Sequence, residues 1–172
     1  MKKIYIAILL LLTTQTTRAD FNDGVVAYLM GDYETAYNTM ISLAATSEDG
    51  LSQYYLGVMY LKGQGVEQNF EEAAKWLRQA SEKSLPQAQY KLANLYTEGK
   101  GVPRDYEFAY VWYSVGVAHQ HALSMNAVDG AREKLSADEL AAAEKLITEY
   151  IEKYGPKEKE EEDPYKSAQA PE

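Results

Sequence analysis

The chain has 172 residues, of which 46% are apolar and 25% are charged, so one ordinary globular domain with its own core is expected. Its 26 acidic residues outnumber its 17 lysines and arginines, and the formal charge of −9 disfavours a nucleic-acid partner. It contains no cysteine and two histidines, which excludes disulfides, thiolate zinc sites and cysteine nucleophiles.

Residues 1–19 have the three-part pattern of a secretory signal peptide. A short basic start precedes an apolar run over residues 4–12, and small polar residues follow up to Ala19. We therefore expect cleavage after Ala19 and a periplasmic or secreted mature chain. The alternative is an N-terminal membrane anchor, but the apolar run is much shorter than the ~20 residues that span a bilayer. No later run is long enough to insert the mature chain into a membrane.

Two stretches of the chain, residues 51–86 and 87–122, repeat each other at a shift of 36 residues and without a gap. Identical residues cluster at spacings that matter for helix packing, which is the signature of a repeat architecture. The identical pairs are Gln53/Gln89, Tyr54/Tyr90, Leu56/Leu92, Tyr60/Tyr96, Gly63/Gly99, Gly65/Gly101, Val66/Val102, Glu71/Glu107, Ala73/Ala109 and Trp76/Trp112.

Each repeat predicts a helical hairpin. Apolar and small residues at helical spacing predict a first helix, and a Gly-x-Gly-Val segment then breaks it. Asn69 in the first repeat and Asp105 in the second are expected to cap the next helix, with Glu72 at the reciprocal position of a capping box. Gly57 and Ala93 are small enough to let the paired helix approach closely. The second helix of the first repeat has the apolar stripe Ala73, Trp76, Leu77 and Ala80.

These motifs resemble the Sel1-like repeats, which are relatives of the tetratricopeptide repeats. The residues that carry the resemblance are Tyr54-x-Leu56-Gly57-x2-Tyr60-x2-Gly63-x-Gly65-Val66 with Ala73-x2-Trp76, and Tyr90-x-Leu92-Ala93-x2-Tyr96-x2-Gly99-x-Gly101-Val102-Pro103 with Ala109-x2-Trp112. The resemblance implies an all-α fold, a short right-handed α-solenoid of about four helical hairpins.

Two further hairpins are expected around the repeats at 50–85 and 86–121. Residues 20–49 look like a degenerate tetratricopeptide-type hairpin, with Asp32 as the cap of its second helix. Residues 122–155 predict a closing hairpin: a helix over 122–135 with Leu123 on its apolar face, then a helix that begins at the capping box Ser136 to Glu139 and stops at Gly155. Residues 156–172 form an acidic tail that we expect to be disordered, with solubility or docking as its role.

The residues offer little for catalysis. His119 and His121 are expected to be surface residues, the alternative being a weak metal pair. The Gly-x-Gly segments follow no strand and precede no Gly-Lys-Ser/Thr, so a phosphate loop is excluded. The chain has neither Gly-x-Ser-x-Gly nor Ser-x-x-Lys. We therefore expect no enzymatic activity, no metal site and no cofactor.

The resemblance implies that the first helix of each hairpin lines a concave groove that binds a partner peptide or protein segment. The groove residues expected by this analogy are Val25, Tyr28, Leu29, Val58, Leu61, Lys62, Asn94, Thr97 and Glu98. The function expected is a non-catalytic adaptor or regulator in the bacterial envelope. The alternatives are a small hydrolase or cell-wall sugar binder, and a secreted effector directed at a host cell.

Overall fold

The computed structural model describes residues 20–47 and 49–157. The expected signal peptide and most of the acidic tail lie outside these ranges. Within them the chain forms eight α-helices and no strand, which confirms the predicted all-α class. The helices are α1 (Phe21–Met30), α2 (Tyr33–Ser47), α3 (Gly50–Lys62), α4 (Phe70–Glu82), α5 (Pro86–Glu98), α6 (Tyr106–Ala118), α7 (Ala122–Arg132) and α8 (Ala137–Tyr154).

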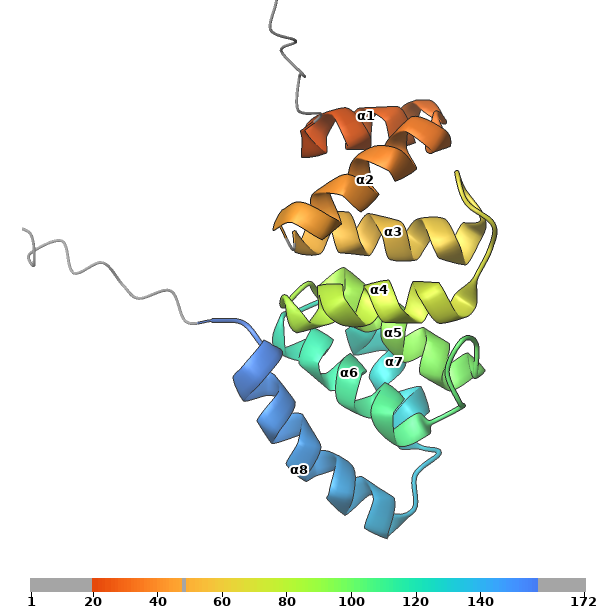
Figure 1. Cartoon of the computed structure of the whole chain (residues 1–172). Coiled ribbons are helices and arrows are strands. Elements are labelled where there is room, and N and C mark those ends of the chain that lie inside the picture. The colour runs from red at the N-terminus through yellow and green to blue at the C-terminus, as the bar shows by residue number, and fades with distance from the viewer. Residues whose placement is uncertain (1–19, 48, 158–172) are drawn as a thin grey trace, which may run out of the picture.

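The first six helices form three antiparallel hairpins that follow one another down the molecule (Figure 1). Within each hairpin the two helices pack along each other, and the second helix also packs against the first helix of the next hairpin. This nearest-neighbour pattern is that of a helical solenoid. Among the described helices, none is both long enough and apolar enough to cross a bilayer.

Gly57 allows the close approach of α3 and α4. A Cβ atom built on Gly57 would lie 2.6 Å from Cγ of Leu77 on α4, and Leu77 is fully buried. Gly24 plays the same part in the first hairpin, because a Cβ there would lie 2.8 Å from Cε of Met40 on α2. The small residues that define the repeat are therefore explained by helix packing.

The Gly-x-Gly segments connect the two helices of each repeat and pack against the main chain of the preceding hairpin. Gly65 and Gly101 have φ angles of +72° and +68°, which favour glycine. A Cβ on Gly65 would overlap the main-chain carbonyl group of Tyr33, and a Cβ on Gly101 would overlap that of Phe70. Tyr33 and Phe70 begin α2 and α4, so each loop lies against the start of the second helix in the preceding hairpin.

The side chains that begin the second helices act largely as predicted. Asp32 accepts a hydrogen bond from the main-chain N–H of Thr35, and Asp105 accepts one from that of Phe108. Ser136 and Glu139 form the predicted capping box at the start of α8, and α8 stops before Gly155.

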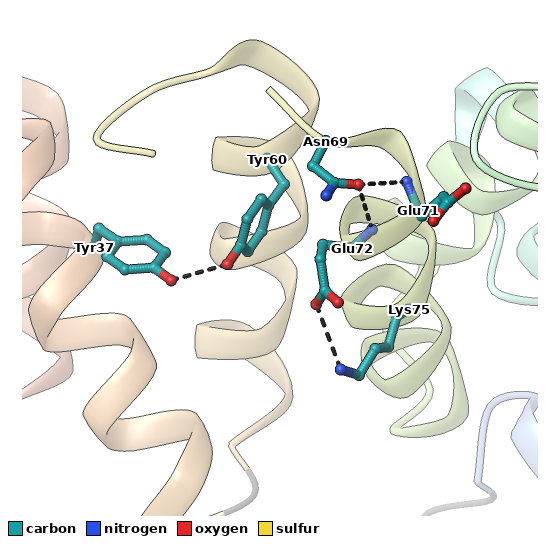
Figure 2. A network of polar contacts seen from close by, with 6 residues as sticks. All are labelled: Tyr37, Tyr60, Asn69, Glu71, Glu72 and Lys75. Carbon is teal, nitrogen blue, oxygen red and sulfur yellow. Dashed lines mark hydrogen bonds and ion pairs between the residues drawn. The ribbon is translucent and has the colours of Figure 1, made fainter. Parts of the chain in front are cut away.

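Asn69 caps α4 by accepting hydrogen bonds from the main-chain N–H groups of Glu71 and Glu72 (Figure 2). The capping box predicted here is wrong. The Glu72 carboxylate does not return a hydrogen bond to Asn69 but lies 3.4 Å from Nζ of Lys75, one turn further along the exposed side of the helix.

The last two helices depart from the hairpin pattern. α7 packs against α6, and α8 also lies against α6, whereas α7 and α8 hardly touch (Figure 1). α7 ends at Arg132 and not at residue 135, and Leu123, predicted on its apolar face, is 52% exposed. The predicted closing pair therefore forms as two helices that both use α6 as their support.

The sequence gives a physical reason for this departure. Ser52, Ala88 and Ser124 are fully buried and lie 36 residues apart, so α7 continues the register of α3 and α5. In that register Asp129 stands where α3 has Gly57 and α5 has Ala93. A carboxylate side chain at the position of closest approach prevents α8 from packing tightly against α7.

Candidate interaction surface

Exposed large apolar side chains lie on one kind of helix only. Among the described residues, each of these side chains belongs to α1, α3 or α7, which are first helices, and none belongs to a second helix. We call the side of α1, α3, α5 and α7 that faces away from the second helices the first-helix face. Scattered exposed apolar residues are normal, but their restriction to one class of helix marks a candidate contact surface. They are Val26, Leu29, Met30, Leu51, Leu123 and Met125.

The nine predicted groove residues differ widely in exposure. Three are open to solvent, five are half-buried, and Val58 is buried with 6% of its surface exposed. Val58 therefore supports the core and offers a partner little surface in this conformation. The open ones are Leu29, Lys62 and Glu98, and the half-buried ones are Val25, Tyr28, Leu61, Asn94 and Thr97.

Tyr28 and Lys62 are brought together by the packing of α1 on α3. The Tyr28 hydroxyl donates to Oε1 of Gln64 at 2.9 Å, and Nζ of Lys62 donates to the same hydroxyl at 3.5 Å. The Tyr28 ring also makes edge contacts with the rings of Tyr33 and Tyr55, at centroid distances of 5.5 and 5.3 Å. This part of the first-helix face is an aromatic surface with one amine at its edge.

The α5 part of the face is polar, and its side chains make hydrogen bonds and an ion pair within the protein. Asn94 Oδ1 accepts a hydrogen bond from the hydroxyl of Tyr113 on α6, and Thr97 donates its hydroxyl hydrogen to the main-chain oxygen of Asn94. Glu98 forms an ion pair with Lys100 at 2.7 Å. Asn94 is therefore a structural residue as well as a candidate contact residue.

Lys91 is a further residue of this face that sequence reasoning missed. It lies half-buried on α5, and burial together with the nearby charge of Lys62 lowers the pKa of its ammonium group. The sequence did contain a signal: Lys91 stands 36 residues after Tyr55, so the second repeat has a lysine where the first has an aromatic residue. Two amines, Lys62 on α3 and Lys91 on α5, are thus close enough for their charges to interact.

The two histidines, predicted as surface residues, are half-buried and make contacts within the fold. Nε2 of His119 donates a hydrogen bond to the main-chain oxygen of Tyr154 at 3.0 Å, which requires a proton on that nitrogen. His121 contacts the Ser124 hydroxyl at 3.0 Å and the ring of Tyr90 at 5.5 Å between centroids. Burial, with a smaller contribution from His119, lowers the pKa of His121. Both histidines therefore stabilise the C-terminal helices.

The acidic residues do not gather into a cation site. Over residues 20–47 and 49–157, no group of three or more histidine, aspartate or glutamate side chains could hold a metal ion. One polar contact joins two hairpins: the hydroxyls of Tyr37 and Tyr60 lie 2.9 Å apart, beside the capped start of α4 (Figure 2). These contacts are explained by helix packing and capping.

The fold and this surface define an α-helical repeat protein. A model of the Sel1 repeat matches residues 50–85 and 86–116, which are the α3–α4 and α5–α6 hairpins. The chain therefore contains two Sel1 repeats, as its motifs predicted. No curated protein matches the chain.

Two solved structures have the same kind of fold. One is a protective antigen of uropathogenic Escherichia coli strains that displays an SLR fold; it is 29% identical, with a TM-score of 0.75 over 88% of this chain and 32% of that chain. The other is a Sel1 repeat protein from Oxalobacter formigenes, 25% identical, with a TM-score of 0.59 over 76% of this chain and 56% of that chain. This chain spans about a third of the length of the first of these structures.

Proposed function

We propose that this chain is a non-catalytic interaction module whose first-helix face binds a segment of a partner protein. The observation that carries the proposal is the restriction of the exposed large apolar side chains to α1, α3 and α7. Such side chains gain free energy when a partner covers them, at about 25 cal/mol per Å² of apolar surface buried. Sel1 repeats are interaction modules in general, which supports a protein as the partner.

The chemistry of this face favours a partner segment with an apolar part and an acidic part. Leu29 and the aromatic rings around Tyr28 offer apolar surface on the α1 side. Lys62 and Lys91 place two amines beside it. Electrostatic attraction would then orient the segment, while apolar contacts would supply most of the affinity.

We further propose that the protein works in the bacterial envelope, as an adaptor or regulator. The basic, apolar and small-residue pattern of residues 1–19 supports this location. N-terminal sequencing of the protein from a fractionated cell tests it. A mature chain that begins at Asp20 in the periplasm or the medium is expected, and an intact Met1 in the cytoplasm would contradict it.

Crosslinking in the native envelope tests the interaction surface. Leu29→Glu and Lys62→Glu change exposed side chains of the first-helix face, so the fold is expected to be retained. The matched controls are Ala142→Glu and Lys145→Glu, which change exposed side chains on α8. One partner should be recovered with the wild type and with both controls, and lost with the two face variants. Equal recovery with all five proteins would contradict the proposed surface.

A further inference from the structure

A second surface, separate from the first-helix face, lies where α7 lacks a paired helix. In the hairpins before it, the equivalent positions are covered by a second helix: Gly57 packs on Leu77 of α4, and the Tyr96 ring lies 5.4 Å from the Phe108 ring of α6. The residues of α7 in this register are Asp129 and Arg132, and α8 does not cover them. We call this uncovered side of α7 the α7 seat.

The α7 seat opens into a cleft between α6, α7 and α8. The cleft has a volume of about 410 Å³ and mostly apolar walls, formed by Tyr110 and Val117 of α6, Val128 of α7 and Ile151 of α8. A neighbouring hollow of about 440 Å³ shares Asp129 and Arg132 and extends to Leu140 at the start of α8. The cleft therefore continues along α7 and α8 and is not a closed pocket.

Two opposite charges stand at the rim of this cleft. Asp129 and Arg132 are both exposed and lie one turn apart on α7. Within the described part of the chain, neither side chain takes part in an ion pair or a side-chain hydrogen bond. The cleft therefore has an apolar floor with one unpaired carboxylate and one unpaired guanidinium at its edge. This surface complements a helix that has an apolar stripe, a basic residue facing Asp129 and an acidic residue facing Arg132.

We propose that the α7 seat binds an amphipathic α-helix of a partner protein, in the place that a paired second helix takes in the preceding hairpins. The helix carries a lysine or arginine facing Asp129 and an acidic residue facing Arg132. Its length is set by the helices that fill this place in the repeats, α4 and α6, each of which has 13 residues. This binding would occur beside α7 and α8, so it does not depend on the first-helix face.

Peptides that copy α4 provide a test with a known register. In the α3–α4 hairpin, Leu77 faces Gly57, and Asp129 stands at the equivalent position of α7. The first probe is a capped peptide with the sequence of residues 70–82. The second is the same peptide with Leu77→Lys, which places an amine opposite Asp129. Both are titrated into the ¹⁵N-labelled whole chain, and amide resonances are followed by NMR.

The lysine peptide is expected to shift the resonances of Val128, Asp129 and Arg132 and to bind roughly three- to fivefold more tightly than the unmodified peptide, as one exposed ion pair allows. With the Asp129→Ala protein this preference should disappear. The matched control, Glu67→Ala, removes an exposed carboxylate from the loop between α3 and α4 and should keep the preference.

Three results would overturn the proposal. The first is the absence of shifts on α7 with either peptide at about 1 mM, a concentration at which even weak peptide binding is seen. The second is a preference for the lysine peptide that survives Asp129→Ala. The third is a set of shifts confined to α1, α3 and α5. The last result would show binding at the first-helix face instead. The Leu29→Glu variant separates the two surfaces, because it should leave binding at the α7 seat unchanged.

Discussion

The side-chain amide of Gln89 donates a hydrogen bond to the main-chain oxygen of Tyr154, 3.1 Å away and 65 residues later in the chain. The same amide nitrogen donates to the main-chain oxygen of Ser81, and the Tyr154 oxygen also accepts from His119. Gln89 is fully buried, so these bonds are shielded from water. One repeat residue therefore anchors the end of α8 to the body of the protein.

Gln89→Met is expected to lower the free energy of unfolding by about 1–2 kcal/mol, because the main-chain oxygens of Ser81 and Tyr154 each lose a hydrogen bond from a buried amide. Hydrogen exchange should also become faster at the end of α8. Gln53→Met is the matched control at the equivalent position. Oε1 is buried without a partner in both glutamines, but no side-chain hydrogen bond of Gln53 is found in the described part of the chain, so the expected loss is smaller. Equal losses in the two variants, measured by urea unfolding, would contradict this anchoring role.

Gly57→Ala is expected to destabilise the protein by about 1–3 kcal/mol, because the added methyl group would overlap the Leu77 side chain. Gly130→Ala is the matched variant in another helix, where a Cβ meets no atom within 4 Å. That change should stabilise the protein by roughly 0.5–1 kcal/mol through helix propensity. Urea unfolding of both proteins measures the two effects, and the prediction fails if they have the same sign.

The Tyr37–Tyr60 contact predicts a loss of stability at high pH. Burial, then the hydrogen bond and the charge of Tyr37, raise the pKa of Tyr60 to about 12, against 10.0 for a free tyrosine. A raised pKa means that the folded state holds the proton more tightly, so the stability it gives is complete below pH 10 and lost as the pH rises toward 12.

Tyr37→Phe should lower the pKa of Tyr60 and make this loss of stability less steep. Urea unfolding at several pH values above 9 measures the slope. Tyr33→Phe removes another half-buried hydroxyl for which no side-chain hydrogen bond is found in the described structure, and it should leave the slope unchanged. A Tyr37→Phe protein with the wild-type slope would show that the contact does not govern the titration of Tyr60.

His121 predicts an effect in the opposite direction, at mildly acidic pH. Burial and the charge of His119 lower its pKa, so the folded state binds this proton less tightly than the unfolded chain does. The stability that results is present above the usual histidine pKa of 6.5 and is lost as the pH falls below it.

His121→Asn should therefore reduce the fall in unfolding free energy between about pH 7 and pH 5, the range in which histidine titrates. Asparagine is a good N-cap, so the start of α7 is expected to remain folded. Chemical unfolding at these two pH values provides the measurement. An unchanged difference between them would assign the acid sensitivity to other groups.

The repeat part of the fold could be predicted from the sequence because each residue type there has one dominant physical reason. Gly57 permits close packing, Gly65 has a positive φ angle, and Asp105 caps a helix. Two similar units at a fixed spacing, with ten identical residue pairs, supported each interpretation against the other. These are local effects, and they need no knowledge of the rest of the molecule.

The end of the array could not be predicted in the same way. The capping box of Ser136 and Glu139 fixes where α8 begins, but not which helix α8 packs against. That choice depends on Asp129, whose significance appears only when α7 is placed in the register of the two repeats. Likewise, the burial of Val58 and the bond from Tyr113 to Asn94 depend on helices far away in the sequence.

Because α8 contacts α4 and α6 and bonds to α5, it ties the last two full hairpins into one cooperative unit. Among the described helices, none makes a comparable contact with the α1–α2 hairpin, which packs against α3 of the hairpin that follows it. Under mild denaturant or mechanical tension, we expect this N-terminal hairpin to unfold first while the remaining helices stay folded. The less stable N-terminal hairpin thus displays three of the six exposed large apolar side chains found in the described part of the chain.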